Sequence, residues 1–572
     1  MEDVLTRSPP GTVPEVPAGG TSSPDGPAPP GPRRRRSWWP GWAGAGRGLP
    51  RRLAGQDLSG RLSGWKWFDL VLVSALMALS LALRWRTLST SYWGDEAIAI
   101  GIAVHPVRSL PHYLVNDGSP PLYYVMLHFW MRLFGRSEQA THALSMIAAL
   151  ACVPVAWWSG RRLFGLWAAR AAAALVATCA YLDYYSTETR MYSWLVLAAI
   201  AGITCFVLAF SGAGRGYWAA ATVLMTAVLY LQYYGLYLLA ATVIAGTAVA
   251  LWGRSRQKLL ATLLYGGTCL AAFAPWARQF FYQVDNTGAP WAPHPSWLDF
   301  FGDPFNALAS AAWAAPLAAI ALAVLAPRVR VRPAGPVAAG CALALTTAIP
   351  LLVLALAWSA AQVVNSWNPR YLGIAAVPGL VALAGGLARA RWRLPALVAV
   401  TLAMALTATP VLVDRGVTVR TSKSDVAYLL AELKPELRPG ALVISAEVTN
   451  TPVVALDLGP EYRYATPFGL LADPLVVNWS DLPTRLQDIN AESDLARLLS
   501  KVPVGGQVLL FNPTTWGGEE TPQRYAGPVK AEGVAANQVI VTDPQLRAEV
   551  TEPVPRYSDP LYPMTATLFV KI

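Results

Sequence analysis

Eleven long apolar stretches, separated by short polar loops, occupy most of the chain between residues 67 and 413. An α-helix needs about 20 mainly apolar residues to cross the hydrocarbon core of a bilayer. The expected helices are Trp67–Leu83, His142–Gly160, Ala171–Thr187, Met191–Phe210, Tyr217–Tyr234, Gly235–Trp252, Leu259–Ala277, Pro304–Ala326, Ala334–Ala360, Tyr371–Ala388 and Leu394–Val413. Only 14% of the residues are charged, against about 25% in a typical soluble domain. The sequence therefore predicts an α-helical polytopic membrane protein with about eleven transmembrane helices.

Basic residues gather in every second loop between these helices. They are Arg161, Arg162, Arg215, Arg254, Arg256, Lys258, Arg328, Arg330, Arg332, Arg389, Arg391 and Arg393. Because Lys and Arg accumulate in cytoplasmic loops, the N-terminus is predicted to be cytoplasmic, and eleven crossings place the C-terminus outside. The predicted location is the plasma membrane, with a C-terminal domain that is extracellular or periplasmic. The net charge of +11 follows from this topology and indicates no nucleic-acid partner.

Three regions follow from the composition. Residues 1–64 are rich in Pro, Gly and Arg and are predicted to be a disordered cytoplasmic segment. Residues 65–420 form the transmembrane domain, whose first external loop, 84–141, is long enough to fold into interfacial helices. Residues 421–572, called the tail domain below, are predicted to be a small external α/β domain. Its expected elements are the helix Val426–Leu437 and the strands Ala441–Ser445, Gln507–Phe511 and Thr567–Ile572.

Polar sequence features are concentrated at the predicted outer ends of the helices. Tyr92–Ala97 contains paired carboxylates, and Asn116–Tyr124 lies further along the same external loop. Tyr184–Tyr192 forms the turn between the third and fourth predicted helices, and Asn368–Tyr371 opens the tenth. We therefore expect the chemistry of this protein at the outer membrane–water interface.

In this order and topology, these four segments resemble the lipid-dependent glycosyltransferases of the C superfamily (GT-C). The closest likeness is to the branch that contains the protein O-mannosyltransferases and the aminoarabinose transferase of lipid A. The resemblance covers roughly residues 67–390. It implies transfer of a mannose-like or arabinose-like sugar from a polyprenyl-phosphate donor to an external acceptor, with inversion at the anomeric carbon. A glycolipid, a polysaccharide and a secreted protein all stay open as the acceptor.

The resemblance also implies roles for individual residues. Asp95 would be the general base, since an acceptor hydroxyl must lose its proton as it attacks the sugar. Arg190 and Arg370 match motif positions and would bind the donor phosphate, because a guanidinium offers a fork of donors to an anion. Arg84 also lies at an outer helix end and is a further candidate for the phosphate.

Other residues of the same motifs are expected to support the site. Glu96 would orient the base, bind a cation or cap the helix that follows. The remaining supporting or substrate-binding candidates are Asp117, Tyr185, Glu188, Gln232 and Tyr371. Gln232 stands where several relatives carry a histidine, which puts a metal requirement and the identity of the sugar in question.

Several alternatives stay open at this stage. Asp95 could be the N-cap of a helix over Glu96–Ile102, and Asp117 could be a turn residue before Gly118. His105 and His112 could join the two aspartates around a divalent cation, although no cofactor is required by the chemistry. Two other functional classes are a transporter or flippase, which the uncharged helix centres disfavour, and a noncatalytic scaffold of cell-envelope assembly.

Overall fold

The computed structural model describes residues 67–309, 339–390, parts of 392–404, 423–516, 521–555 and 563–572. The predicted N-terminal segment 1–64 lies outside the described residues. The same holds for most of the predicted helices Pro304–Ala326 and Leu394–Val413.

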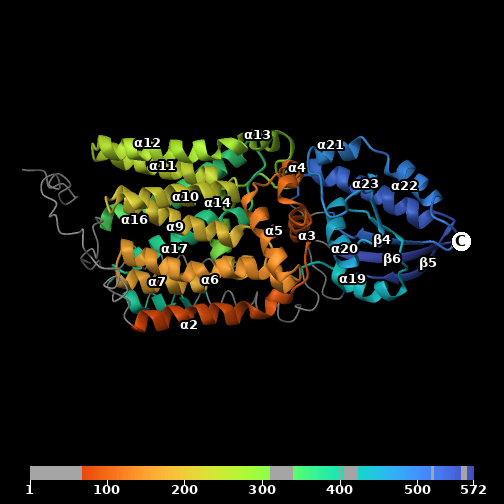
Figure 1. The fold of residues 1–572 in the computed structure, drawn as a ribbon, viewed down its shortest axis with the longest axis horizontal. Coiled ribbons are helices and arrows are strands. Elements are labelled where there is room, and N and C mark those ends of the chain that lie inside the picture. The colour runs from red at the N-terminus through yellow and green to blue at the C-terminus, as the bar shows by residue number, and fades with distance from the viewer. Residues whose placement is uncertain are drawn as a thin grey trace, which may run out of the picture. The chain divides into compact units, whose positions relative to one another are not determined.

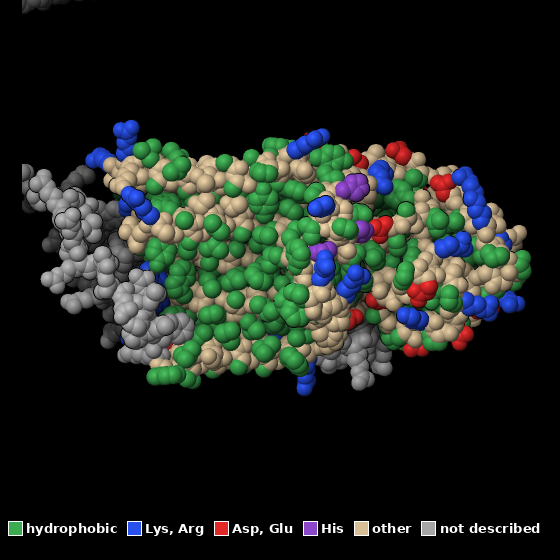
Figure 2. Space-filling view, in the orientation of Figure 1, with side chains coloured by type: hydrophobic (Ala, Val, Ile, Leu, Met, Phe, Trp, Pro, Cys, Tyr) green, Lys and Arg blue, Asp and Glu red, His purple; other side chains and the backbone are tan. Residues whose placement is uncertain are grey.

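Long apolar helices packed side by side form the part of the chain before residue 390 (Figure 1). They are α2 (Trp67–Arg84), α6 (Glu138–Leu163), α7 (Leu166–Ala177), α9 (Tyr192–Phe210), α10 (Arg215–Leu231), α11 (Gly235–Trp252), α12 (Arg256–Phe273), α16 (Ala339–Ala361) and α17 (Gly373–Leu387). Within the described ranges, six helices are long and apolar enough to cross a membrane, and α7 and α17 are shorter apolar helices. Figure 2 shows a broad band of hydrophobic side chains over these helices. The chain is a multi-pass membrane protein.

The third predicted helix, Ala171–Thr187, is wrong as a single element. The structure divides it into α7, which ends at Ala177, and the short helix α8 (Ala180–Tyr185). Asp183 of α8 accepts a hydrogen bond from Nε of Arg84 at 2.6 Å, and the Arg84 side chain also donates to the carbonyl of Ala177 at the end of α7. A buried charge needs a partner, and the break in the helix supplies both a carboxylate and a free carbonyl to one arginine.

The loop between residues 84 and 141 contains helices. α3 (Gly94–Ala103), α4 (Leu110–Asp117) and α5 (Leu122–Phe134) follow one another in the chain. α3 is buried along almost its whole length, which its run of Ala, Ile and Gly residues explains. Two further helices after α12, α13 (Ala277–Asn286) and α14 (Trp297–Ala309), and the 3₁₀ turn Pro369–Tyr371 complete the part of this domain that the site uses.

The tail domain contains a six-stranded sheet with the order β3-β2-β1-β4-β6-β5. The strands are β1 (Leu442–Ser445), β2 (Arg463–Thr466), β3 (Gly469–Leu470), β4 (Gln507–Pro513), β5 (Leu546–Glu552) and β6 (Met564–Lys571). β1 runs parallel to β2 and to β4, whereas β6 is antiparallel to β4 and to β5. The predicted strands Ala441–Ser445, Gln507–Phe511 and Thr567–Ile572 fall on β1, β4 and β6.

Helices cover both faces of this sheet (Figure 1). They are α19 (Val426–Leu433), α20 (Thr451–Leu458), α21 (Leu482–Gln487), α22 (Ala491–Ser500) and α23 (Gln523–Thr542). Successive side chains of a strand point to opposite faces. Accordingly Val443 packs in one buried cluster with α19 and α20, and Leu442 and Ile444 pack in another with α22 and α23. All four residues of β1 are buried, as expected for a central strand with helices on both sides.

Backbone and side-chain contacts join the tail domain to the external loop. The backbone N–H of Trp479 donates a hydrogen bond to the carbonyl of Asn116 at 2.9 Å. The hydroxyl of Ser424 donates a hydrogen bond to the carbonyl of Tyr92 at 2.8 Å. Gly101 of α3 lies directly against the backbone of Leu475, where a Cβ atom would overlap the leucine carbonyl. Because Gly101 has no side chain, the backbone of the tail domain can approach α3 closely at this position.

We expect Gly101→Ala to weaken this contact, because overpacking typically costs about 1–3 kcal/mol. The measurement is thermal unfolding of the purified protein, together with the rate of limited proteolysis of the tail domain. Gly267→Ala in α12 is the matched control, since nothing lies within 4 Å of a Cβ placed there. Equal stability and equal protease resistance of the two variants would contradict the proposed role of Gly101.

Candidate active site

Asp95 lies between two arginines that are distant from it in sequence. Its Oδ2 accepts a hydrogen bond from Nη1 of Arg370 at 2.5 Å and lies 4.0 Å from Nη2 of Arg190. Nη1 of Arg190 also donates to the backbone carbonyl of Asp95 at 3.3 Å. The side chain of Asp95 is 23% exposed, so a substrate can reach it, while both arginine side chains are more buried.

Local structure explains how Asp95 is placed. The helix α3 begins at Gly94 and its N-cap is Trp93, so Asp95 is in the first turn and the N-cap alternative for it is wrong. An acidic residue in the first turn is favoured by the exposed N–H groups and the helix dipole. The carboxylate can therefore point away from its own helix, toward the arginines.

Arg370 is held from several sides. Oδ1 of Asn368 accepts from its backbone N at 3.0 Å and from its Nε at 3.1 Å, which fixes the turn that carries it. Its guanidinium lies over the rings of Trp291, Trp93 and Tyr371, at 4.6, 5.7 and 5.9 Å from their centroids. Cation–π contacts of this kind orient a guanidinium without neutralising it. Trp291 was not singled out from the sequence.

Glu96, the neighbour of Asp95, points into the protein and is fully buried. Its Oε1 accepts from the backbone N of Thr189 at 2.7 Å, from Nε2 of His142 at 2.8 Å and from Nζ of Lys423 at 2.9 Å. The other ring nitrogen of His142 faces the carbonyl of Leu88 at 2.8 Å. The carboxylate of Glu96 thereby joins four segments of the chain. Its contact with the backbone N of Trp93, the N-cap of α3, is weaker, at 3.4 Å.

Lys423 belongs to the tail domain and was missed in the sequence analysis. Its Nζ lies 2.9 Å from Oε2 of Glu96 and 3.6 Å from Oε1 of Glu188, and it donates to the carbonyl of Thr187. Oε2 of Glu188 accepts from Nε1 of Trp93 at 3.0 Å. No sequence motif distinguishes Lys423 from the neighbouring basic residues Arg415 and Arg420.

The surroundings of Glu96 set its protonation. Burial disfavours the carboxylate form, but the charge of Lys423, the charge of and hydrogen bond from His142, and the N–H of Thr189 outweigh burial and lower the pKa of Glu96 to about 2. Glu96 is therefore a permanent anion that ties the loop, the turn before α9 and the tail domain together.

Asp117 ends α4 and is followed by Gly118 in the left-handed conformation. Its Oδ2 accepts a hydrogen bond from the Tyr124 hydroxyl at 2.7 Å. Burial raises the pKa of Asp117, although the nearby charge of Arg190 opposes this. Asp117 is thus near enough to Arg190 for their charges to interact.

Tyrosine rings form a continuous layer beneath the arginines. The ring of Tyr185 lies 4.7 Å from that of Tyr192, which lies 6.3 Å from Tyr371, which in turn lies 5.0 Å from Tyr234. Oε1 of Gln232 accepts from the backbone N of Tyr234 at 2.5 Å. Gln232 therefore supports the end of this layer and does not line the cavity around Asp95.

Two predicted candidates lie apart from Asp95. The guanidinium of Arg84 is fully buried and is bound to Asp183 and Ser80, so the structure does not bring it to the other two arginines. Nε2 of His105 lies 2.9 Å from Oδ2 of Asp473 in the tail domain. Within the described ranges, no group of three or more His, Cys, Asp or Glu residues is arranged to hold a metal ion.

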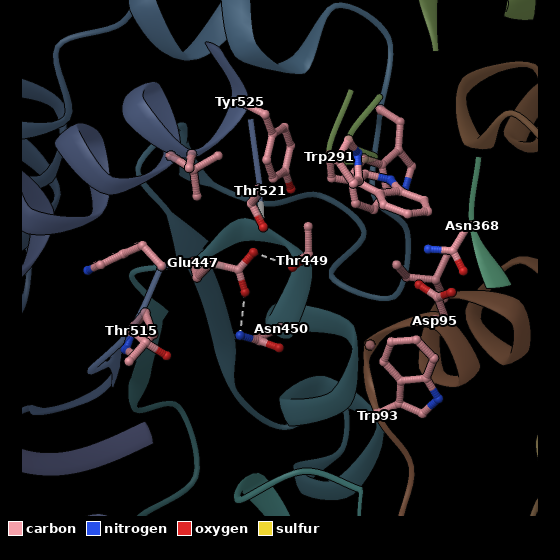
Figure 3. A pocket seen from close by; sticks show the side chains of 18 of the residues that line it. Trp93, Asp95, Trp291, Asn368, Glu447, Thr449, Asn450, Thr515, Thr521 and Tyr525 are labelled. Atoms are coloured by element: carbon pink, nitrogen blue, oxygen red, sulfur yellow. Dashed lines mark hydrogen bonds between the residues drawn. The ribbon is translucent and has the colours of Figure 1, made fainter. Parts of the chain in front are cut away.

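Asp95 and Arg370 line a cavity of about 530 Å³ between the membrane helices and the tail domain. Figure 3 shows Trp93, Asp95 and Asn368 on one side of it and Glu447, Asn450 and Tyr525 across from them. The other lining residues are Gly94, Ile98, Trp291, Pro293, Thr449, Trp479, Pro513, Thr515, Trp516, Thr521, Ala526 and Val529. A carboxylate beside two guanidiniums, open to a cavity, can accept a proton next to an anionic leaving group.

Part of the chain is similar in sequence to a known protein family. Residues 118–278 match the family model of dolichyl-phosphate-mannose-protein mannosyltransferases. No curated protein sequence gives a significant match to the chain. The matched segment holds Arg190, Glu188 and Tyr185, and it ends before the tail domain.

Two solved structures share the fold over nearly the whole chain. ArnT from Cupriavidus metallidurans in the apo state has a TM-score of 0.56 and 14% sequence identity, and the match covers 89% of this chain and 98% of that one. The same protein bound to undecaprenyl phosphate has a TM-score of 0.55 and 14% identity over 88% and 98% of the two chains. The unmatched 11% of the chain is smaller than the tail domain, so the match includes at least part of that domain.

The pKa of Glu96 leads to a prediction about stability and pH. Glu96→Gln should lower the free energy of unfolding at pH 7 by about 3–5 kcal/mol, the cost of breaking a buried ion pair. Because the folded pKa of about 2 lies below the ordinary value of 4.5, the stabilisation is complete above pH 4.5 and is lost as the pH falls toward 2. The difference between the thermal midpoints of wild type and variant should therefore shrink over this range.

Glu461→Gln is the control, since Glu461 is an exposed residue of the tail domain. Its midpoint should equal that of the wild type at every pH. A difference between wild type and Glu96→Gln that stays constant from pH 7 to pH 2 would contradict the ionised state of Glu96.

Proposed function

We propose that the chain is a glycosyltransferase that transfers a sugar from a polyprenyl-phosphate donor to a hydroxyl acceptor on the outer face of the membrane, because residues 118–278 match the mannosyltransferase family model and the fold is similar to that of ArnT. The sugar is mannose-like or arabinose-like, and its anomeric carbon is inverted. The observation that carries this proposal is the position of Asp95, whose Oδ2 lies 2.5 Å from Arg370 and 4.0 Å from Arg190 at the edge of the cavity.

The proposed step is a single displacement. The acceptor oxygen forms a bond to the anomeric carbon of the donor sugar while the bond from that carbon to the phosphate oxygen breaks, and the electron pair of this bond leaves with the polyprenyl phosphate. The acceptor proton passes to the carboxylate of Asp95, which acts as general base. A phosphate leaves as a stable anion, so the step needs positive charge near the phosphate and no general acid.

Arg190 and Arg370 supply that charge in the proposed mechanism. Nη1 of Arg370 donates a hydrogen bond to Oδ2 of Asp95, and Nη2 of Arg190 lies 4.0 Å from the same oxygen. A bidentate fork of donors matches phosphate oxygens well. When the phosphate takes over part of these hydrogen bonds, the carboxylate is left with fewer donors and becomes a better proton acceptor. Because two guanidiniums provide the charge, the proposed mechanism uses no resident metal or other cofactor.

The topology belongs to the same proposal. The N-terminus is cytoplasmic, and the external loop and the tail domain lie on the outer side, as the alternation of basic loops indicates. Arg161 and Arg162 lie in the last turn of α6. Near the start of the same helix, His142 contacts Glu96, the neighbour of Asp95, and Ser145 donates a hydrogen bond to the carbonyl of Arg190.

Asp95→Asn should leave expression and donor affinity nearly unchanged, while transfer falls by about 10²-fold or more, because the amide cannot accept the proton. The assay uses purified protein, radiolabelled polyprenyl-phosphate mannose or arabinose, and a membrane extract as the source of acceptor. Asp494→Asn is the matched control, since this residue is also in the first turn of a helix but lies on α22, away from the cavity. Transfer at the wild-type rate by folded Asp95→Asn would remove the assignment of the base.

Arg190→Ala and Arg370→Ala should each raise the Michaelis constant for the donor about tenfold or more and should lower turnover. A hydrogen bond to a charged group contributes about 1.5–3 kcal/mol, and each variant loses at least one to the phosphate. Arg497→Ala, an exposed arginine of α22, should change neither constant. If both site variants keep the wild-type constant for the donor, the two arginines hold only Asp95 and the structure of the loop.

A further inference from the structure

The cavity beside Asp95 has a second wall, which the tail domain provides. Most of its residues come from the segment after β1, the segment after β4 and the beginning of α23. Glu447, Thr449 and Asn450 follow β1, and Thr515 and Trp516 follow β4, while Thr521 and Tyr525 precede or begin α23. The mechanism proposed above uses none of these residues, so this wall needs an explanation of its own.

The order of the strands gives the wall a specific place in the fold. β1 and β4 are parallel neighbours, and the chain leaves β1 toward β2 on one side but returns to β4 on the other. α20, which connects β1 to β2, lies on one face of the sheet, whereas α22, which precedes β4, lies on the other. Ligands of α/β sheets bind in the crevice outside the carboxyl ends of the strands at such a switch point. The cavity residues Glu447 and Thr515 lie just beyond those ends.

The chemistry of the wall combines flat rings with hydrogen-bonding groups. Trp516 and Tyr525 bring aromatic faces from the tail domain, and Trp479 is a third lining ring. Thr449, Asn450, Thr515 and Thr521 add hydroxyl and amide groups to the same lining (Figure 3). A sugar has apolar C–H faces that pack on aromatic rings and hydroxyl groups at its edge, so this mixture suits a saccharide.

The charged groups that line the cavity further restrict the chemical class of ligand that can bind there. Glu447 is only 8% exposed, and it accepts hydrogen bonds from Oγ1 of Thr449 and from Nδ2 of Asn450. Burial raises the pKa of Glu447. Of the described residues that line the cavity, Arg370 is the one cation, and it is bound to Asp95. A phosphorylated or acidic ligand would meet Glu447 with no basic group on this wall to receive it.

We propose that the tail-domain wall of this cavity is the acceptor subsite, and that it takes an uncharged saccharide. The rings of Trp516 and Tyr525 pack against the sugar, and Glu447 and Asn450 hydrogen-bond to its hydroxyl groups. The role of this saccharide as the acceptor of the reaction rests on the proposed function, whereas the binding of the saccharide does not. The opposite wall then presents Asp95 to the free hydroxyl that attacks the donor.

The test measures binding without any donor. Full-length protein in nanodiscs is titrated with neutral manno-, arabino- and galacto-oligosaccharides, with the same oligosaccharides carrying a phosphate monoester, and with a peptide rich in Ser and Thr. Saturation-transfer NMR reports which probe contacts the protein. At least one neutral oligosaccharide should bind, and its phosphorylated form should bind more weakly.

Variants test whether the saccharide binds at the tail-domain wall. Trp516→Leu and Glu447→Ala should each weaken saccharide binding about tenfold or more, the effect expected for removing one good contact in a closed site. Trp252→Leu and Glu461→Gln are the matched controls, since both residues are exposed and neither lines the cavity, and both should bind as the wild type does. If Trp516→Leu does not fold, Asn450→Ala takes its place in the comparison.

Three results would overturn the proposal. These are binding of the peptide or of only the phosphorylated saccharides, binding of no probe at all, and wild-type affinity in folded variants of the wall. Asp95→Asn separates this outcome from that of the proposed function, because it should bind the saccharide normally while transfer is lost. A wild-type protein that binds saccharide but transfers no sugar would refute the proposed function and leave the saccharide site in place.

Discussion

A buried carboxylate holds together the parts of this protein that form the candidate site. Glu96 is fully removed from solvent, and it is stable as an anion only because Thr189, His142 and Lys423 all donate to it or face it. An unpaired charge in this position would cost several kcal/mol. The same requirement fixes the external loop, the turn before α9, the start of α6 and the beginning of the tail domain in one arrangement. Asp95 is placed accurately because its neighbour cannot move.

The consecutive carboxylates of Asp95 and Glu96 therefore differ in their exposure and in what they can do. Glu96 accepts hydrogen bonds from several buried donors and has a pKa far below any working pH, so it cannot exchange a proton with a substrate. Asp95 is partly exposed and is bound by Arg370 and Arg190, whose guanidiniums a phosphate can recruit. An acidic pair in a loop is ambiguous until the surroundings of each member are known. Burial assigns structure to one carboxylate and leaves the other available for chemistry.

This difference shows what the sequence could and could not predict. Many of the apolar helices can be predicted from hydrophobic patterns, because those patterns are local. The break inside Ala171–Thr187 cannot, since it depends on the pairing of Asp183 with Arg84, which is 99 residues away in the chain. Lys423 was missed for the same reason: its role comes from tertiary contacts across more than 300 residues. The motifs single out Asp95 and Glu96 as a pair, but only the structure shows that Glu96 is buried and that Asp95 is partly exposed.

The position of the tail domain follows from the same physics at a larger scale. In the proposed mechanism, Asp95 takes a proton from the acceptor next to cations that attract a phosphate, so water would compete as an acceptor unless a second surface encloses the site. The tail domain provides that surface with the carboxyl ends of β1 and β4, where an α/β sheet ordinarily binds ligands. Its contact with α3 is close because Gly101 has no side chain, and Lys423 anchors its beginning to Glu96. The ion pair that stabilises the loop is thus also the contact that keeps the second wall of the cavity facing Asp95.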